Sequence, residues 1–262
     1  MAGKYQAPTV KKAFQILDRI AHARNGLKIS DLSVALGISK STVHGITAAL
    51  EEQGAVVRET QTKRYRLGFT LFELGRKVHV RTDLKDIARP FMEALMEKIG
   101  ESVFLGICNG DHVTILDIVE SMNDLKITSP IGTTIPLLAG ATGKVFLSGM
   151  TDSKADQLVR TRGLVQYTPS SIVTRESFLA EVAQARRNGY ATDDEEYIPG
   201  VRAVAAPVKN IEPLMAAIWV VGFKPSMNGG KTNGLVIDTR QTAEAISSKI
   251  DAMKRNGHDI KA

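Results

Sequence analysis

The stretch ISDLSVALGISKSTVHGITAALEEQGAVVRETQTKRYRLG, residues 29–68, decides the N-terminal fold. Ser30 is a favourable N-cap residue, so it predicts that a short helix covers residues 31–36. Gly37 follows at once, and glycine commonly occupies the position directly after a helix. A start signal and a stop signal so close together predict a short helix that is followed directly by another.

The second half of the stretch predicts another helix and a hairpin. Ser39 is expected to cap a helix that extends to about Glu52. Residues 56–60 and 63–67 then form two strand-like runs. The joint at residues 61–62 lacks an Asn-Gly pair, so we expect a slightly longer loop there. A helix, a turn, a helix and a basic hairpin together predict a winged helix-turn-helix, a structure that reads duplex DNA.

One face of the second helix is expected to meet DNA. At about 100° per residue, Val43, Ile46 and Leu50 share the side that faces the core. The opposite side and the helix start offer small and polar groups for bases and phosphates, and the wing offers cations for phosphates. The alternative is an ordinary solvated face. The predicted DNA-binding residues are Ser39, Lys40, Ser41, Thr42, His44, Gly45 and Ala48 on the helix and Lys63, Arg64 and Arg66 on the wing.

The charge distribution supports a nucleic-acid partner for this part of the chain. Residues 1–80 hold 13 Lys/Arg against 6 Asp/Glu, whereas the remainder holds 21 against 22. The excess of positive charge therefore lies in the N-terminal third. A basic segment joined to a neutral one indicates a nucleic-acid reader with a separate sensor.

The rest of the chain predicts a linker helix and an α+β domain. Residues 69–82 form an apolar helical pattern, which we expect to dimerise with a second copy or else to pack on its own domain. Residues 83–262 alternate helical and strand-like runs, which predicts one mixed, mainly antiparallel sheet flanked by helices. The expected helices cover 84–99, 140–148, 153–160, 174–188 and 238–254, and the expected strands cover 102–108, 112–120, 125–129, 203–208 and 214–222.

Composition excludes several classes of protein. The sequence has 43% hydrophobic and 24% charged residues, which is typical of a globular protein. It has no apolar run near 20 residues and no apolar segment at its start, so neither a membrane span nor a secretory signal is expected. A single cysteine, Cys108, fits a reducing cytoplasm. The histidines show no metal-ligand spacing, so no metal and no cofactor are expected.

Four stretches resemble one known family. They are SKSTVHGITAALEEQG (39–54), RYRLGFTLFELG (64–75), AGATGKVFLSG (139–149) and GYATDDEEYIPGVRAVAAPV (189–208). These stretches and their order are similar to the IclR family of bacterial transcription regulators. The resemblance implies a winged helix-turn-helix over residues 1–68 and a GAF-like effector-binding domain over 83–262. It also implies a homodimer, often assembled into a tetramer, that binds double-stranded operator DNA and a small-molecule effector.

The resemblance also implies where the effector binds. The family's pocket lies between the central sheet and the loop that begins a helix, which here is residues 136–143. Backbone N–H groups at that helix start suit a carboxylate. The effector-binding positions carried over are Ile127, Ile135, Ala141, Thr142, Asp193, Val201, Ala203, Trp219 and Val221.

Departures from the family pattern predict the effector's chemistry. Family members that bind small acids often have small residues with a hydroxyl group at the positions that Trp219 and Val221 occupy here. A histidine is common at the position of Leu138. We therefore expect a more apolar pocket, suited to an organic acid with an aromatic or alkyl body. The alternative is that Trp219 fills the pocket. Gly45 stands where the family usually has a larger residue, and it leaves the base specificity open.

Two other functions compete with that of a ligand-responsive regulator. Some GAF-like domains are enzymes that reduce sulfoxides, but that chemistry uses several cysteines and this chain has one. A DNA-binding structural protein without a ligand is the second. The acidic run 193–196 resembles a metal or acid–base cluster, yet it lacks matching histidines or cysteines. We therefore expect no catalytic residue.

Overall fold

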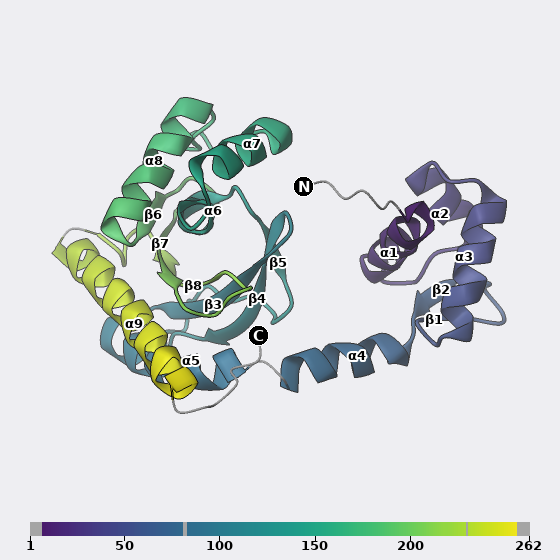
Figure 1. The fold of residues 1–262 in the computed structure, drawn as a ribbon, viewed down its shortest axis with the longest axis horizontal. Coiled ribbons are helices and arrows are strands. Elements are labelled where there is room, and N and C mark those ends of the chain that lie inside the picture. The colour runs from purple at the N-terminus through teal and green to yellow at the C-terminus, as the bar shows by residue number, and fades with distance from the viewer. Residues whose placement is uncertain (1–6, 81–82, 229, 256–262) are drawn as a thin grey trace. The chain divides into compact units, whose positions relative to one another are not determined.

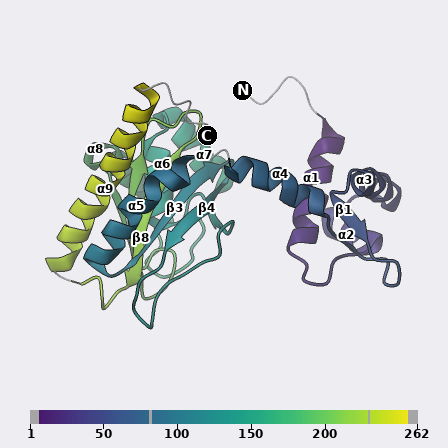
Figure 2. The same cartoon turned by 90° about the horizontal axis from the view of Figure 1, so that it is seen from below.

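The computed structural model describes residues 7–80, 83–228 and 230–255. The chain divides into two compact units between residues 81 and 82, and each unit is described by itself. Figures 1 and 2 show the elements of both units from two directions. Among the described residues, no helix is both long and apolar enough to cross a membrane.

The first unit is the predicted winged helix-turn-helix. Helices α1 to α3 pack around a core that includes Ile16, Leu32, Val43 and Tyr65. A two-stranded antiparallel hairpin follows α3, and a further helix follows the hairpin. The elements are α1 (Pro8–Ala21), α2 (Ile29–Leu36), α3 (Lys40–Glu52), β1 (Val56–Arg58), β2 (Tyr65–Leu67) and α4 (Phe69–Val80).

Local caps explain where these helices begin and end. The predicted cap of α3 is confirmed, because the Ser39 hydroxyl accepts the Thr42 N–H at 3.2 Å. Gly37 ends α2 with a φ of 63°, in the left-handed region. The prediction for the start of α2 is wrong: Ser30 lies inside the helix. Asp31 accepts the N–H of Lys28 at 3.0 Å, so the carboxylate caps the helix from its first turn.

The second unit is an α+β domain built on a six-stranded sheet with the order β5-β4-β3-β8-β7-β6. All of its strand pairs among the described residues are antiparallel, so the expected mixed sheet is corrected to an antiparallel one. The strands are β3 (Ser102–Asn109), β4 (His112–Val119), β5 (Thr134–Pro136), β6 (Ala191–Asp194), β7 (Val201–Val208) and β8 (Ala216–Phe223).

Two strands differ from the sequence prediction. Residues 125–129 form no strand, because Lys126 and Thr128 reach back to the Glu120 carboxylate and hold the segment as a loop. The edge strand is β5, a few residues later. Strand β6 was not predicted, since its sequence Ala-Thr-Asp-Asp has low strand propensity.

Helices cover both faces of the sheet (Figure 1). One face packs on α5 (Asp83–Ile99) and α9 (Gly230–Arg255), which lie side by side in Figure 2. The other face packs on α6 (Gly140–Ser148) and α8 (Arg175–Asn188), with α7 (Asp152–Arg162) against α8. Helix α9 begins earlier than the predicted residue 238. Each face has its own buried cluster, and successive residues of β8 alternate between them: Ile218 and Val220 belong to the first, Trp219 and Val221 to the second.

Candidate functional sites

The outer face of α3 is exposed as predicted. Ser41, His44, Gly45 and Ala48 are exposed, whereas Val43 and Ile46 are buried. A Cβ placed on Gly45 would meet no atom within 4 Å. The face is therefore a small, open surface with one large side chain.

Hydroxyl groups gather at the start of α3. The Ser39 hydroxyl lies 3.1 Å from the Ser41 hydroxyl and 2.8 Å from the Thr42 hydroxyl. Lys40 is exposed beside them. This cluster places polar hydrogen atoms and one cation at the positive end of a helix, an arrangement suited to a phosphate group.

The three predicted cations of the wing lie in different surroundings. Lys63 and Arg66 are exposed. Arg64 is half-buried, and its Nη1 donates to the Gly26 carbonyl at 2.9 Å and lies 3.9 Å from the Asp31 carboxylate. The Arg64 guanidinium therefore fastens the wing to the helical core, and Lys63 and Arg66 are the wing cations that present their charge to solvent.

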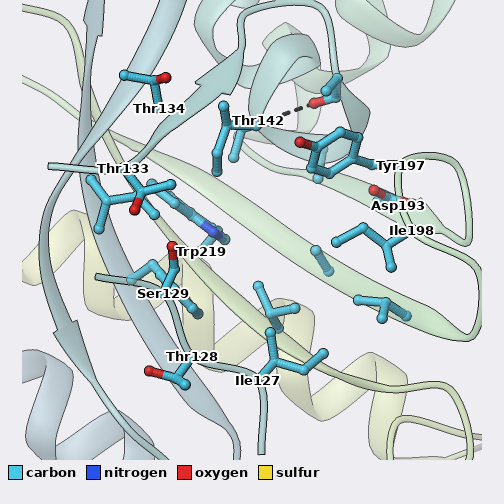
Figure 3. A pocket seen from close by; sticks show the side chains of 18 residues that line it. Ile127, Thr128, Ser129, Thr133, Thr134, Thr142, Asp193, Tyr197, Ile198 and Trp219 are labelled. Atoms are coloured by element: carbon cyan, nitrogen blue, oxygen red, sulfur yellow. Dashed lines mark hydrogen bonds between the residues drawn. The ribbon is translucent and has the colours of Figure 1, made fainter. Parts of the chain in front are cut away.

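A cavity of about 230 Å³ opens in the second unit between the sheet and the start of α6 (Figure 3). All nine positions predicted to bind an effector line it, although they come from six separate segments of the chain. They are Ile127, Ile135, Ala141, Thr142, Asp193, Val201, Ala203, Trp219 and Val221.

Nine further residues, which the sequence did not identify, also line the cavity. Three of them come from the loop 127–133, part of which was predicted to be a strand, and several of the nine carry hydroxyl groups (Figure 3). The lining is therefore richer in hydroxyl groups than the substitutions at Trp219 and Val221 predicted. The added residues are Phe104, Ile115, Thr128, Ser129, Thr133, Thr134, Ala139, Tyr197 and Ile198.

Trp219 forms part of the cavity floor. Its side chain is only 2% exposed, and its ring stacks on Phe104 with centroids 5.5 Å apart and planes 9° apart. The ring edge lies over Gly106, where an added Cβ would approach Trp219 Cη2 to 2.7 Å. Gly106 therefore leaves the space that the indole occupies, and the cavity remains open beside it.

The start of α6 forms another wall. Its N-cap residue, Ala139, has no side-chain acceptor, so it caps none of the N–H groups of the first turn. Gly140 has a φ of 51°, and a Cβ there would collide with the Asp193 carboxylate. The glycine thus allows an acidic side chain to lie against a helix start.

Asp193 is a buried carboxyl group on the cavity wall, 7% exposed. Burial raises its pKa to about 6, although the Glu196 N–H donates to Oδ1 at 2.6 Å and favours the ionised form. The nearby Glu196 carboxylate raises the pKa further, and Lys144 lowers it. The group therefore titrates near neutral pH.

Lys144 connects α6 to β6 and the loop after it. It is 1% exposed, and its Nζ donates to the Thr192 carbonyl at 2.9 Å and to Glu196 Oε1 at 2.6 Å. The Glu181 carboxylate lies 3.6 Å away on α8. Burial raises the pKa of Glu196, and the ammonium of Lys144 opposes that shift. A buried ion pair thus holds two walls of the cavity together.

Other candidate chemistries find little support in the described part of the chain. No group of three or more His, Cys, Asp or Glu side chains there could hold a metal ion. Cys108 is half-buried, and burial raises the pKa of its thiol, which disfavours the nucleophilic thiolate.

The fold and these sites define a winged helix-turn-helix regulator with a ligand-binding domain. A family model described as the IclR helix-turn-helix domain matches residues 9–60. A second, described as the bacterial transcriptional regulator IclR C-terminal domain, matches residues 76–248. The chain therefore belongs to the IclR family of bacterial transcriptional regulators.

Individual relatives agree with the family assignment. The chain is 33% identical over 209 residues to the HTH-type transcriptional regulator XynR of Escherichia coli, covering 80% of this chain and 83% of that protein. An IclR transcriptional regulator from Alicyclobacillus acidocaldarius superposes with a TM-score of 0.77 at 25% identity, over 94% of this chain and 100% of the other. An IclR homologue of Microbacterium hydrocarbonoxydans, solved with 4-hydroxybenzoate, has the same fold, with a TM-score of 0.73 at 20% identity, over 93% and 99%.

Proposed function

We propose that this chain is a ligand-responsive, non-enzymatic regulator that binds double-stranded operator DNA and a small organic acid in the cytoplasm. The observation that supports the sensor role most strongly is the cavity beside α6, which is lined by the nine residues carried over from the family resemblance. Binding of an effector there shifts the DNA affinity of the first unit. Such coupling between two sites is typically about 1–3 kcal/mol.

The exposed face of α3 reads the major groove in this proposal. Ser41, His44, Gly45 and Ala48 approach base edges, and the hydroxyl cluster at Ser39 binds a phosphate. Lys40, Lys63 and Arg66 add salt-dependent affinity, because each neutralised phosphate releases counterions. Arg64 contributes by holding the wing in place, with part of its charge available to DNA.

The proposed effector is an acid with a compact apolar body. The N–H groups at the start of α6 suit a carboxylate, and Trp219, Phe104 and Ile127 suit an apolar body. The lining contains no Lys, Arg or His among the described residues, so the carboxylate of the effector is bound by neutral hydrogen-bond donors and not by a cation. The relative solved with 4-hydroxybenzoate makes that acid a useful first probe.

A homodimer is also part of the proposal. The first part of α4 exposes Phe69, Phe72 and Leu74, and the two phenylalanine rings lie 5.2 Å apart. An apolar helix face of this kind is stabilised when a second copy covers it. A regulator without an effector is less well supported, because Trp219 leaves the cavity open rather than filling it.

A thermal-shift screen combined with DNA binding tests this function. Pyruvate, benzoate and 4-hydroxybenzoate are added to the full chain, and DNA fragments are selected by binding from sheared genomic DNA. We expect at least one acid to raise the melting temperature and to change the affinity for the selected fragments. Failure of the full chain to select any DNA sequence would contradict the operator assignment.

A further inference from the structure

The cavity contains one strong hydrogen-bond donor that the fold itself does not use. Trp219 is 2% exposed, and its indole N–H donates to no acceptor within the described part of the chain. In Figure 3 the indole nitrogen faces the open middle of the cavity. The nitrogen itself is not sealed off, because the buried, unpartnered side-chain atoms of the described residues are Thr239 Oγ1 and Arg240 Nε only. Its N–H is therefore free to donate to a molecule that occupies the cavity.

The ring is fixed by contacts on its other sides. Phe104 stacks on one face at 5.5 Å, and the backbone at Gly106 lies under the far edge of the six-membered ring. On β8, Trp219 pairs with Phe104 of β3 and Ala205 of β7, so its backbone is held by both neighbouring strands. The direction of the N–H is therefore set by the fold before any ligand arrives.

Further uncommitted donors surround the same space. The hydroxyl groups of Ser129, Thr133 and Tyr197 lie around the cavity in Figure 3. Burial raises the pKa of Tyr197, so its hydroxyl keeps its proton. The uncapped N–H groups at the start of α6 add to this set. The cavity thus offers several neutral donors and no cation among its described lining residues.

We propose that Trp219 determines effector specificity by donating its indole N–H to a carboxylate oxygen of the bound acid. The inference rests on the proposed small-acid function and adds a residue that selects for an acceptor oxygen. The indole nitrogen can only donate, so a ligand atom that forms a hydrogen bond with its N–H must be an acceptor. A ligand of the same shape with a methyl group at that point leaves the donor unpaired and binds more weakly.

The chain provides a direct optical test, since Trp219 is its only tryptophan. Pyruvate, benzoate and 4-hydroxybenzoate are titrated against the full chain while its tryptophan emission is followed. We expect a saturable change in emission with at least one of these acids. Toluene, which has the ring of benzoate without its oxygens, serves as the matched ligand and is expected to bind at least tenfold more weakly than benzoate.

The decisive variant removes the indole N–H of Trp219 and keeps the shape of the ring. Expression in a tryptophan auxotroph with β-(3-benzothienyl)alanine exchanges the indole N–H for sulfur and keeps the ring shape, and only position 219 is affected. By calorimetry, the acid that binds the unaltered protein is expected to lose at least tenfold in affinity, about 1.4 kcal/mol. Melting temperature without ligand checks that the fold is kept. Phe104→Leu, which retains the N–H, is the matched control and is expected to lose less.

The outcomes separate this inference from the function it rests on. Equal affinity of the sulfur-containing and unaltered proteins would overturn the role of the Trp219 N–H and leave the acid sensor standing. Equal affinity for toluene and benzoate would overturn both the inference and the small-acid proposal, because the carboxylate would then contribute nothing to binding. If none of the three acids binds the unaltered protein at millimolar concentration, both the inference and the small-acid proposal fail.

Discussion

The two faces of the six-stranded sheet differ in how completely they are packed. The face under α5 and α9 is a continuous apolar cluster that includes Met92, Ile218 and Ile246. The face under α6 and α8 has an apolar cluster too, but it also encloses a cavity, a buried lysine and a buried aspartate. One face is filled by apolar side chains, and the other keeps space and polar groups beside which a further molecule can bind.

Strand β8 shows how one sequence produces both faces. Alternate residues of a strand point to opposite sides, so Ile218 and Val220 belong to the face under α5 and α9, which we call the closed face. Trp219 and Val221 line the cavity on the face under α6 and α8, which we call the open face. The variants below test this contrast, in order of decreasing expected effect.

The largest effect is expected from Lys144→Met on the open face. The change leaves the buried Glu196 carboxylate without its cation, and breaking a buried pair in this way costs about 3–5 kcal/mol. Urea unfolding measures the loss. Adding Glu196→Gln is expected to recover part of it, since the second change removes the unpaired charge. Full additivity of the two single losses would contradict the proposed pairing.

On the closed face, Ile246→Ala should lower stability without affecting ligand binding. Ile246 is fully buried on α9, and truncation of such a residue costs about 2–5 kcal/mol through lost burial and a new cavity. Ile127→Ala, on the wall of the open cavity, is the matched control. We expect it to cost less stability and more affinity for the probe acid, measured by urea unfolding and calorimetry. The reverse pattern would refute the division between the faces.

Asp193→Asn should remove a pH dependence from the open face. Because the folded pKa of about 6 lies above the ordinary 3.8, ionisation of Asp193 opposes folding. Its unfavourable contribution grows between about pH 4 and pH 6 and reaches about 3 kcal/mol above that range. Near Asp193, Glu196 and Lys144 are also charged, and they are unchanged in the variant. The stability gained by the variant is therefore expected to be larger at pH 7 than at pH 4.5.

The measurement is the free energy of unfolding of both proteins at the two pH values. For the unaltered protein we also expect tighter binding of the probe acid as the pH falls through 6, since protonation removes a negative charge beside the ligand. A stability difference that is the same at both pH values would show that Asp193 does not titrate in this range.

The smallest effect on stability concerns the first unit. Gly45→Ala adds a methyl group in open space on α3 and should stabilise the helix by about 1 kcal/mol. If this face approaches the groove closely, DNA affinity falls severalfold although stability rises. Gly234→Ala on α9, where a Cβ also meets no atom within 4 Å, is the matched control and should leave DNA affinity unchanged. Equal DNA affinity of both variants would remove Gly45 from the contact surface.

Much of the architecture could be predicted because the local signals agree with the tertiary packing. Ser39 and Gly37 fix the turn between α2 and α3 by capping and by a left-handed backbone, both of which depend on residue type alone. The apolar run of β4 likewise marks a strand, every second residue of which is buried. The family resemblance then located the nine residues that meet in the cavity.

The errors concern residues whose conformation depends on distant partners. Thr128 and Lys126 are loop residues because Glu120 binds them, and the apolar character of the segment gave no sign of this. Lys144 belongs to the stretch 139–149 that resembles the family, but its ion pair with Glu196 joins residues 52 apart in the sequence. The bond from the wing residue Arg64 to the Gly26 carbonyl joins residues 38 apart and has no local sequence signal either, while the DNA contact of Arg64 stays a prediction. Contacts between side chains that are far apart in the sequence cannot be predicted from the local pattern of residues around each of them.

The central claim is that occupancy of the cavity changes DNA binding, and one measurement tests it directly. The affinity of the full chain for its selected DNA fragment is determined with and without a saturating concentration of the probe acid, and saturation is verified through Trp219 emission. We predict a change in dissociation constant of at least about fivefold, which corresponds to a coupling of about 1 kcal/mol. An unchanged dissociation constant with the cavity fully occupied would contradict the account.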